Sequence, residues 1–203
     1  SLLHKLHSAN KEVKSGKWNR KSNIGIELGE MTVGILGYGN MGSALAQRLI
    51  GFGSNVIAYD KYKAKYSDQF VKELEYDEFF KRTDILSIHV PLTEETKFMI
   101  NDEYLNKFRK NIIVINTARG KVLNTEDLVK NLHTGKILAA GLDVLEYEKT
   151  HFESVITDNN SDVLNYLTKA ENVLITPHVA GSSAASYRKI AEVLADKILQ
   201  LKI

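Results

Sequence analysis

The chain has 203 residues, of which 43% are hydrophobic and 26% are charged, and its formal net charge is +2 at pH 7. This composition is typical of a folded globular domain, while the small net charge and the lack of an apolar run of ~20 residues argue against nucleic acid and membranes as partners. Because the chain has no cysteine, disulfides and thiolate metal sites are excluded, and we expect a cytoplasmic protein without a metal centre.

An amphipathic segment opens the chain. Apolar residues at positions 2, 3, 6, 9 and 13 have a helical spacing and predict a helix from 2 to about 15, which Gly16 can end. His4 and His7 have the spacing of a metal pair on a helix, but no third ligand lies near them, so we interpret both as exposed polar residues. Trp18 is the only tryptophan, and we expect it to anchor this arm against the domain or against a partner chain.

A strand, a glycine turn and a helix follow one another in the sequence MTVGILGYGNMG, residues 31–42. We predict the strand over 32–36 and the helix from about 41 to 52. Gly37 permits a tight turn, Gly39 lets the backbone approach a pyrophosphate, and Gly42 lets the helix pack closely on the strand. The helix N-terminus then faces the phosphates, so the pattern indicates a dinucleotide site. The alternative is a structural glycine turn in an α/β domain that binds no nucleotide.

Asp60 ends a second apolar strand, residues 55–59, and lies 18 residues beyond Gly42. A carboxylate at this position can accept hydrogen bonds from both hydroxyls of the adenosine ribose and repels a 2′-phosphate, so it favours NAD over NADP. Lys61, Lys63 and Lys65 follow closely and weaken that preference.

Strands alternate with helices in the rest of the chain. We predict strands over 84–90, 112–116, 137–144 and 173–176, and helices over 75–82, 102–108, 125–132 (with Thr125 as N-cap) and about 183–201. Residues 61–72 are expected to form a loop with a short element, and residues 149–170 a long polar segment. Near-continuous apolar strands that alternate with helices predict a doubly wound parallel α/β sheet of the Rossmann type. We divide the chain into a helical arm, 1–30, and the sheet domain, 31–203.

Chemically active side chains follow the later strands, at the carboxyl edge where such sheets bind ligands. The sequences are His-Val-Pro-Leu at 89–92, Asn-Thr-Ala-Arg-Gly at 116–120, Asp143 with Glu146 and Glu148 beyond it, and Pro-His at 177–178. Arginine can hold a carboxylate with two hydrogen bonds, histidine can exchange a proton near neutral pH, and a neighbouring carboxylate can orient the imidazole. Beside a nicotinamide, these three groups suffice to interconvert a 2-oxo acid and a 2-hydroxy acid.

Five motifs in this order resemble the D-isomer-specific 2-hydroxyacid dehydrogenases: GYGNMG with Asp60, HVPLT, NTARG, GLDVLEYE and TPHVAG. The resemblance extends over the whole chain. It implies NAD as cofactor, a small 2-hydroxy or 2-oxo acid as substrate, and a homodimer held through the N-terminal arm. It also implies that Arg119 binds the substrate carboxylate and carbonyl, that His178 is the general acid/base, and that Glu148, rather than Glu146, pairs with His178.

The cofactor contacts that the resemblance implies come from all five motifs. Asp143 would hold the nicotinamide carboxamide, Thr117 and Ala118 would lie along the cofactor, and Gly181 would lie close to the nicotinamide. His89 is interpreted as a wall of the cofactor pocket or as a packed histidine. The complete predicted set is Gly37, Gly39, Asn40, Met41, Gly42, Asp60, Val90, Pro91, Thr96, Thr117, Ala118, Arg119, Asp143, His178 and Gly181.

Members of this family usually carry roughly a hundred more residues ahead of the cofactor domain, which form a substrate domain. That part is missing from this chain, which therefore resembles the cofactor half of an enzyme, and we expect NAD binding with little or no turnover by the chain alone. The segment after Glu148 resembles that of some D-3-phosphoglycerate dehydrogenase-like members. D-3-phosphoglycerate is therefore a candidate substrate, with glyoxylate or hydroxypyruvate and D-lactate as alternatives.

A function of another class fits the same motifs. Dehydrogenase-related transcriptional corepressors sense NAD(H) and can keep the arginine, the histidine and the glutamate, so these residues do not distinguish an NAD(H)-sensing binding protein from an enzyme. A relative of formate dehydrogenase is disfavoured, because that subgroup would be expected to have glutamine where Glu148 stands.

Overall fold

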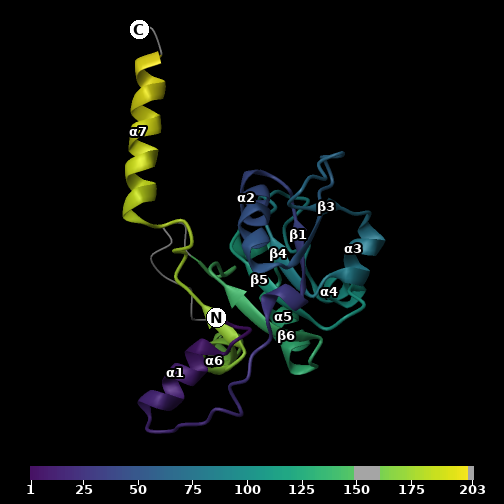
Figure 1. The fold of residues 1–203 in the computed structure, drawn as a ribbon, viewed down its shortest axis with the longest axis vertical. Coiled ribbons are helices and arrows are strands. Elements are labelled where there is room, and N and C mark those ends of the chain that lie inside the picture. Colours follow the sequence, from purple (N-terminus) through teal and green to yellow (C-terminus); the bar gives the residue numbers. More distant parts are fainter. Residues whose placement is uncertain (149–160, 201–203) are drawn as a thin grey trace.

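The structure is a computed structural model that describes residues 1–148 and 161–200 (Figure 1). Within these residues, seven parallel strands form one sheet in the order β3-β2-β1-β4-β5-β6-β7. The strand order reverses between β1 and β4, so the predicted doubly wound Rossmann sheet is confirmed. The strands are β1 (Thr32–Leu36), β2 (Asn55–Tyr59), β3 (Lys72–Glu73), β4 (Ile85–Ile88), β5 (Ile112–Asn116), β6 (Ile137–Leu142) and β7 (Val173–Ile175).

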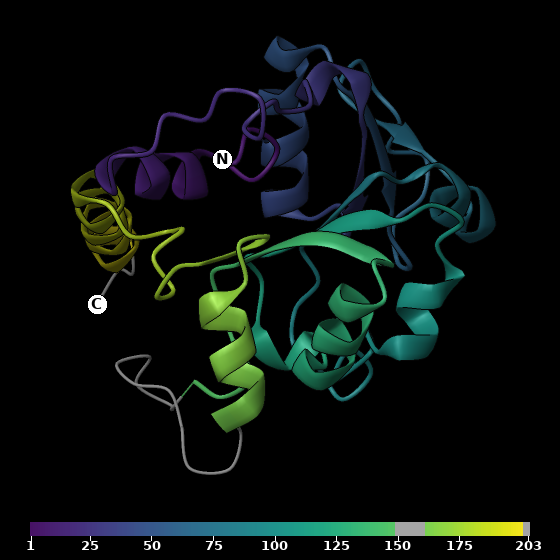
Figure 2. The same cartoon turned by 90° about the horizontal axis from the view of Figure 1, so that it is seen from below.

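Helices cover the two faces of the sheet unequally (Figure 2). One face packs against four helices, and its core includes the fully buried Phe79, Leu105 and Leu128. The other face packs against one helix, through Ala46 and Leu49, and against the first residues of the chain. The four helices are α3 (Tyr76–Arg82), α4 (Asp102–Lys107), α5 (Thr125–His133) and α6 (Ser161–Lys169), and the single helix is α2 (Asn40–Leu49). This asymmetry leaves part of the second face accessible beside α2.

The first and last helices lie outside these layers. Neither α1 (Leu6–Lys14) nor α7 (Ala184–Gln200) buries a residue, and α7 projects away from the sheet (Figure 1). A hydrogen bond of 2.7 Å between His7 Nε2 and the Glu171 carbonyl ties α1 to the domain. Trp18 is 87% exposed, so the expectation that it packs against the domain is wrong, and contact with a partner chain stays a prediction.

Two further expectations are corrected. The predicted polar segment contains α6, which packs Leu167 into the core with 1% exposure, while residues 149–160 lie outside the described part of the chain. Asn124, not Thr125, caps α5, since the Asn124 side chain accepts a hydrogen bond of 3.0 Å from the N–H of Asp127. No helix in the described part of the chain has the length and apolarity that a membrane span requires.

Candidate active site

The glycine turn joins β1 to α2 with the geometry that its sequence predicts. Gly37 has a left-handed backbone, with φ of 92°, and its N–H donates to the carbonyl of Tyr59 across 2.9 Å. A Cβ added at Gly42 would lie 2.2 Å from the Gly37 carbonyl oxygen, so α2 touches the turn there. A Cβ added at Gly39 would meet nothing within 4 Å. The space beside Gly39, at the N-terminus of α2, is therefore open to an anionic group.

Two cavities share the walls formed by Gly39, His89, Val90 and Pro91. The first, of about 410 Å³, is also lined by the predicted residues Gly37, Asp60 and Thr96. The second, of about 430 Å³, is also lined by the predicted residues Asn40, Met41, Thr117, Ala118 and Arg119. The structure thus gathers most of the predicted cofactor residues around the turn. Gly42 lines neither of these two cavities and packs α2 against the turn.

Asp60 fixes the floor of the first cavity. One carboxylate oxygen, Oδ2, accepts the N–H of Tyr38 at 2.7 Å, and Oδ1 accepts the N–H groups of Tyr62 and Lys63 at 2.9 and 3.0 Å. A carboxylate has about four acceptor sites, so these three hydrogen bonds leave capacity for a further donor such as a ribose hydroxyl.

His89 lies between the two cavities, and its side chain is half-buried. Its Nε2 lies 2.8 Å from the hydroxyl of Ser87, and burial lowers the pKa of the imidazole below its ordinary value. The ring is therefore held neutral and forms part of the wall, which agrees with the interpretation of His89 as a packed histidine of the pocket.

His178 and Glu148 form a hydrogen-bonded pair. The distance from His178 Nδ1 to Glu148 Oε2 is 2.8 Å, and Glu148 Oε1 accepts the N–H of Leu145 at 2.6 Å. The side chains are 25% and 16% exposed, so water weakens the interaction only in part. The predicted pairing is present in the structure, and it fixes which ring nitrogen of His178 faces the carboxylate.

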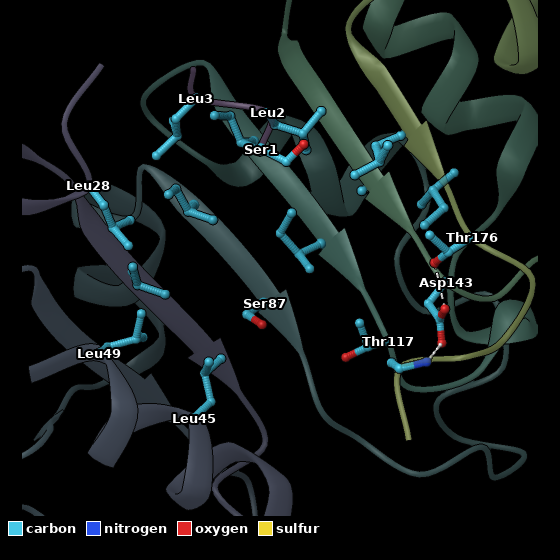
Figure 3. Close-up of a pocket in the computed structure, with 18 of the residues that line it drawn as sticks. Ser1, Leu2, Leu3, Leu28, Leu45, Leu49, Ser87, Thr117, Asp143 and Thr176 are labelled. Atoms are coloured by element: carbon cyan, nitrogen blue, oxygen red, sulfur yellow. Dashed lines mark hydrogen bonds between the residues drawn. The ribbon is translucent and has the colours of Figure 1, made fainter. Parts of the chain in front are cut away.

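Asp143 ties the loop that carries His178 to the end of β6 (Figure 3). Its Oδ1 accepts the Thr176 hydroxyl at 2.5 Å and the N–H of Val179 at 2.9 Å, and its Oδ2 accepts the N–H of Ala180 at 2.9 Å. Burial raises the pKa of the Asp143 carboxyl, but these hydrogen bonds outweigh burial and hold the pKa below its ordinary value. Sequence reasoning missed this structural role.

Arg119 lies on the neighbouring turn, after β5, with an exposed side chain whose Nη1 donates to the Ala118 carbonyl at 2.7 Å. The Asn116 side chain holds this turn, because its Oδ1 accepts the N–H of Ala118 (3.1 Å) and its Nδ2 donates to the Arg119 carbonyl (3.2 Å). A Cβ added at Gly120 would lie 2.1 Å from the carbonyl carbon of Leu145. The arginine turn therefore packs directly on the segment that leads to Glu148.

Glu146, the competing acid, has a structural role. Its Oε2 accepts the N–H of Thr125 at 3.0 Å and so satisfies a donor in the first turn of α5. The geometry therefore separates the two acids: Glu146 supports a helix, whereas Glu148 contacts the imidazole.

A third cavity, of about 480 Å³, lies on the less covered face of the sheet. Its walls are mainly apolar and include Leu2, Leu45 and Leu49, while Thr117 and Asp143 lie together at one side (Figure 3). Gly181 is exposed and lines none of the three cavities, although its carbonyl accepts the Ser186 hydroxyl at 2.7 Å. Among the described residues, no group of three or more His, Cys, Asp or Glu side chains could hold a metal ion.

The sequence matches one protein family over residues 1–180, and that family is described as "D-isomer specific 2-hydroxyacid dehydrogenase, NAD binding domain". A hydroxypyruvate reductase of Thermotoga maritima is 39% identical over 188 residues, which are 93% of this chain and 58% of the relative. A D-3-phosphoglycerate dehydrogenase of Archaeoglobus fulgidus is 34% identical over 203 residues, which are 99% of this chain and 36% of the relative.

Solved structures show the same likeness. The crystal structure of D-lactate dehydrogenase from Aquifex aeolicus, complexed with NAD and lactic acid, superposes with a TM-score of 0.85 at 33% identity. The superposition covers 97% of this chain and 61% of that one. This chain therefore spans less than two thirds of the length of each of these three relatives.

Proposed function

The chain belongs to the D-isomer specific 2-hydroxyacid dehydrogenase family, as its NAD-binding domain, and from this membership we propose the activity of the whole protein. It is an oxidoreductase that interconverts a D-2-hydroxy acid and its 2-oxo acid. The observation that carries the proposal is the 2.8 Å pair of His178 and Glu148, placed on loops at the same edge of the sheet as the glycine turn and Arg119.

The open cradle around Gly39 fits a dinucleotide. The first cavity, with Asp60 at its floor, would hold the adenosine ribose, and the N-terminus of α2 would face the pyrophosphate. Thr117 and Asp143 line the third cavity and would lie toward the nicotinamide. The remaining proposed contacts come from Gly37, Asn40, Met41, Gly42, Val90, Pro91, Thr96, Ala118, Arg119, His178 and Gly181. Asp143 can serve the carboxamide only with the acceptor capacity that its three hydrogen bonds leave.

Bound NAD supplies the acceptor for the hydride that leaves C2 of the substrate. His178 takes the proton of the C2 hydroxyl at Nε2, because its Nδ1 is engaged by Glu148. The Glu148 carboxylate stabilises the imidazolium that forms. The guanidinium of Arg119 has five N–H donors, and one of its nitrogens, Nη1, donates to the Ala118 carbonyl. The other N–H groups would bind the substrate carboxylate and polarise the C2 oxygen.

The substrate is proposed only as a class. The relatives act, by name, on hydroxypyruvate, 3-phosphoglycerate and lactate, and the chain matches them at similar identity. D-3-phosphoglycerate, hydroxypyruvate or glyoxylate, and D-lactate are therefore all candidates. We also propose the division into an arm (1–30) and a cofactor domain (31–203), with a homodimer formed through the arm.

Substitution of the pair in the intact protein tests the mechanism. His178→Gln should lower kcat for NADH-dependent reduction of 2-oxo acids by about 100-fold or more, because it removes the group that exchanges the proton. Its Kd for NADH should stay within a few-fold of the original value. Glu148→Gln should shift the alkaline limb of the pH profile of kcat for this reduction to lower pH, because the neutral amide no longer stabilises the imidazolium that donates the proton.

Glu146→Gln is the matched control, since it neutralises an acid two residues away and keeps an oxygen for the N–H of Thr125. Its pH profile should be that of the unmodified protein. Turnover unchanged in His178→Gln would remove His178 from the mechanism. NADH binding without reduction of any 2-oxo acid in a broad panel would contradict the enzyme and favour an NAD(H)-sensing binding protein.

A further inference from the structure

Three side chains form a polar bridge at the first cavity. Lys61 Nζ and the Tyr62 hydroxyl both bond to the carboxylate of Glu95, one to each oxygen. Lys61 and Tyr62 follow Asp60 after β2, whereas Glu95 belongs to the loop between β4 and α4, so the bridge joins two segments 34 residues apart. All three residues line the cavity of about 410 Å³ that also contains Asp60.

The bridge determines which positive charges are available beside Asp60. The Lys63 ammonium donates to the Tyr38 carbonyl at 2.8 Å, and Lys63 does not line the cavity. Lys61 does line it, but its charge is paired with Glu95. The hydrogen bond and charge of Glu95 raise the pKa of Lys61, and Lys61 and Tyr62 lower the pKa of Glu95, so the pair stays ionised over the neutral range.

A ribose 2′-phosphate would meet an unfavourable site at this position. The phosphate adds about 1.5 to 2 negative charges at neutral pH and needs a lysine or arginine partner. Here it would approach two carboxylates, Asp60 and Glu95, while the lysine that lines the cavity is already engaged. A free 2′-hydroxyl needs only the acceptor capacity of Asp60 and no cation.

We propose that Glu95 is a coenzyme-specificity residue, which holds Lys61 away from the ribose 2′-position and so keeps the cavity selective for NAD(H) over NADP(H). The sequence alone predicts the same preference from Asp60 but a weaker one, because three lysines follow Asp60. The inference rests on the proposed placement of the adenosine ribose in this cavity, and it adds a residue from a different loop to the selection of the cofactor.

Fluorescence titration of the protein with NADH and with NADPH tests this inference through the ratio of the two Kd values. Glu95→Gln should lower the ratio Kd(NADPH)/Kd(NADH) by about tenfold, because it releases Lys61 for a charge-assisted hydrogen bond to the 2′-phosphate. Glu94→Gln is the matched control. It removes the same charge one residue away, and Glu94 neither lines the cavity nor forms an ion pair within the described residues.

The double variant Glu95→Gln/Lys61→Met identifies the group responsible. If Lys61 binds the 2′-phosphate, this variant should lose the tenfold gain, and raised salt should reduce the gain in Glu95→Gln. An equal ratio in Glu95→Gln and Glu94→Gln, or a gain that survives the loss of Lys61, would overturn the inference while NADH binding still supports the proposed function. A protein that binds neither nucleotide would overturn both.

Discussion

His89 is a titratable side chain that the fold keeps neutral. It lies between the two cavities, hydrogen-bonded to Ser87, and burial lowers its pKa below the ordinary 6.5. As the pH falls below 6.5, the unfolded chain therefore takes up the proton before the folded chain does. The stabilising contribution is complete above that pH and is lost as the pH falls toward the pKa of the folded state.

Replacement of this histidine should make stability less sensitive to acid. We expect His89→Gln to lose less unfolding free energy than the unmodified protein between about pH 7 and about pH 5, because one proton-linked difference is removed. Urea unfolding at several pH values measures this, with the exposed His4→Gln as control. Parallel pH dependences in His89→Gln and the unmodified protein would show that His89 is not linked to folding.

Residue roles were predictable where they follow from position along one motif. The pairing of His178 with Glu148 joins two motifs 30 residues apart, and it was predicted only through the resemblance to the family. The structural role of Asp143 was not predictable from the sequence. Its three hydrogen-bond donors come 33 to 37 residues later in the chain, and they reach Asp143 because β7 lies beside β6. The cap of α5 was misplaced by one residue because asparagine and threonine are both good N-caps and stand side by side at 124 and 125.

At the scale of the element, the connection from β1 into α2 contains Gly39, which precedes the helix, and Gly42, which lies in its first turn, and the two positions require glycine for different physical reasons. Gly42 is required by close packing, since any Cβ would meet the Gly37 carbonyl oxygen at 2.2 Å. Gly39 borders open space within 4 Å and lines two cavities. Gly42 therefore serves the packing of the fold, whereas Gly39 leaves open the space that is proposed for the cofactor.

Alanine substitutions at Gly42 and Gly39 should have different effects on stability and on NADH binding. Gly42→Ala should lower the free energy of unfolding by about 1–3 kcal/mol, because the backbone oxygen cannot move aside without displacing α2. Gly39→Ala should leave that free energy within about 1 kcal/mol of the original value, and should weaken NADH binding, because the methyl group enters the space proposed for the pyrophosphate. Urea unfolding and NADH titration of both variants would reveal the reverse pattern if the assignment were wrong.

Elements with strong apolar runs were predicted well, and amphipathic ones less so. The central strands were located to within two residues at each end, because β1, β4 and β5 are buried along most of their length and β6 is a continuous run of apolar residues and glycine. The helix α6 was missed because only one side of it is apolar. That side stabilises the helix through tertiary packing, in which Leu167 is buried in the core. Tertiary packing therefore supplied the missing signal.

At the scale of the molecule, the sheet body is well packed whereas both ends of the chain carry exposed apolar side chains. Trp18 is 87% exposed and Ile24 72% exposed in the arm, and Tyr187 and Ile190 are each 64% exposed on α7. The alternation of strands and helices predicted the sheet, but it could not place α7, because a helix takes its position from what packs on it.

The proposed dimer predicts different effects for the two ends. Trp18→Ala should weaken self-association, because it removes the largest apolar side chain from the arm that is proposed as the interface. Tyr187→Ala, on α7, should leave the association constant within a few-fold of the original value. Sedimentation equilibrium measures both, and a monomeric unmodified protein, or a larger effect of Tyr187→Ala, would contradict an interface formed by the arm.

The backbone at His178 has a consequence for how this chain tolerates change. His178 has a φ of 52°, which lies in the left-handed region. This conformation raises the free energy of a residue with a Cβ, such as histidine, by about 1 kcal/mol, whereas glycine adopts it at almost no cost. Screening a variant library for foldedness alone would accordingly enrich glycine or asparagine at this position, whereas screening for turnover would retain histidine. The left-handed backbone does not favour histidine at position 178, so the proposed proton transfer is the reason to expect histidine there.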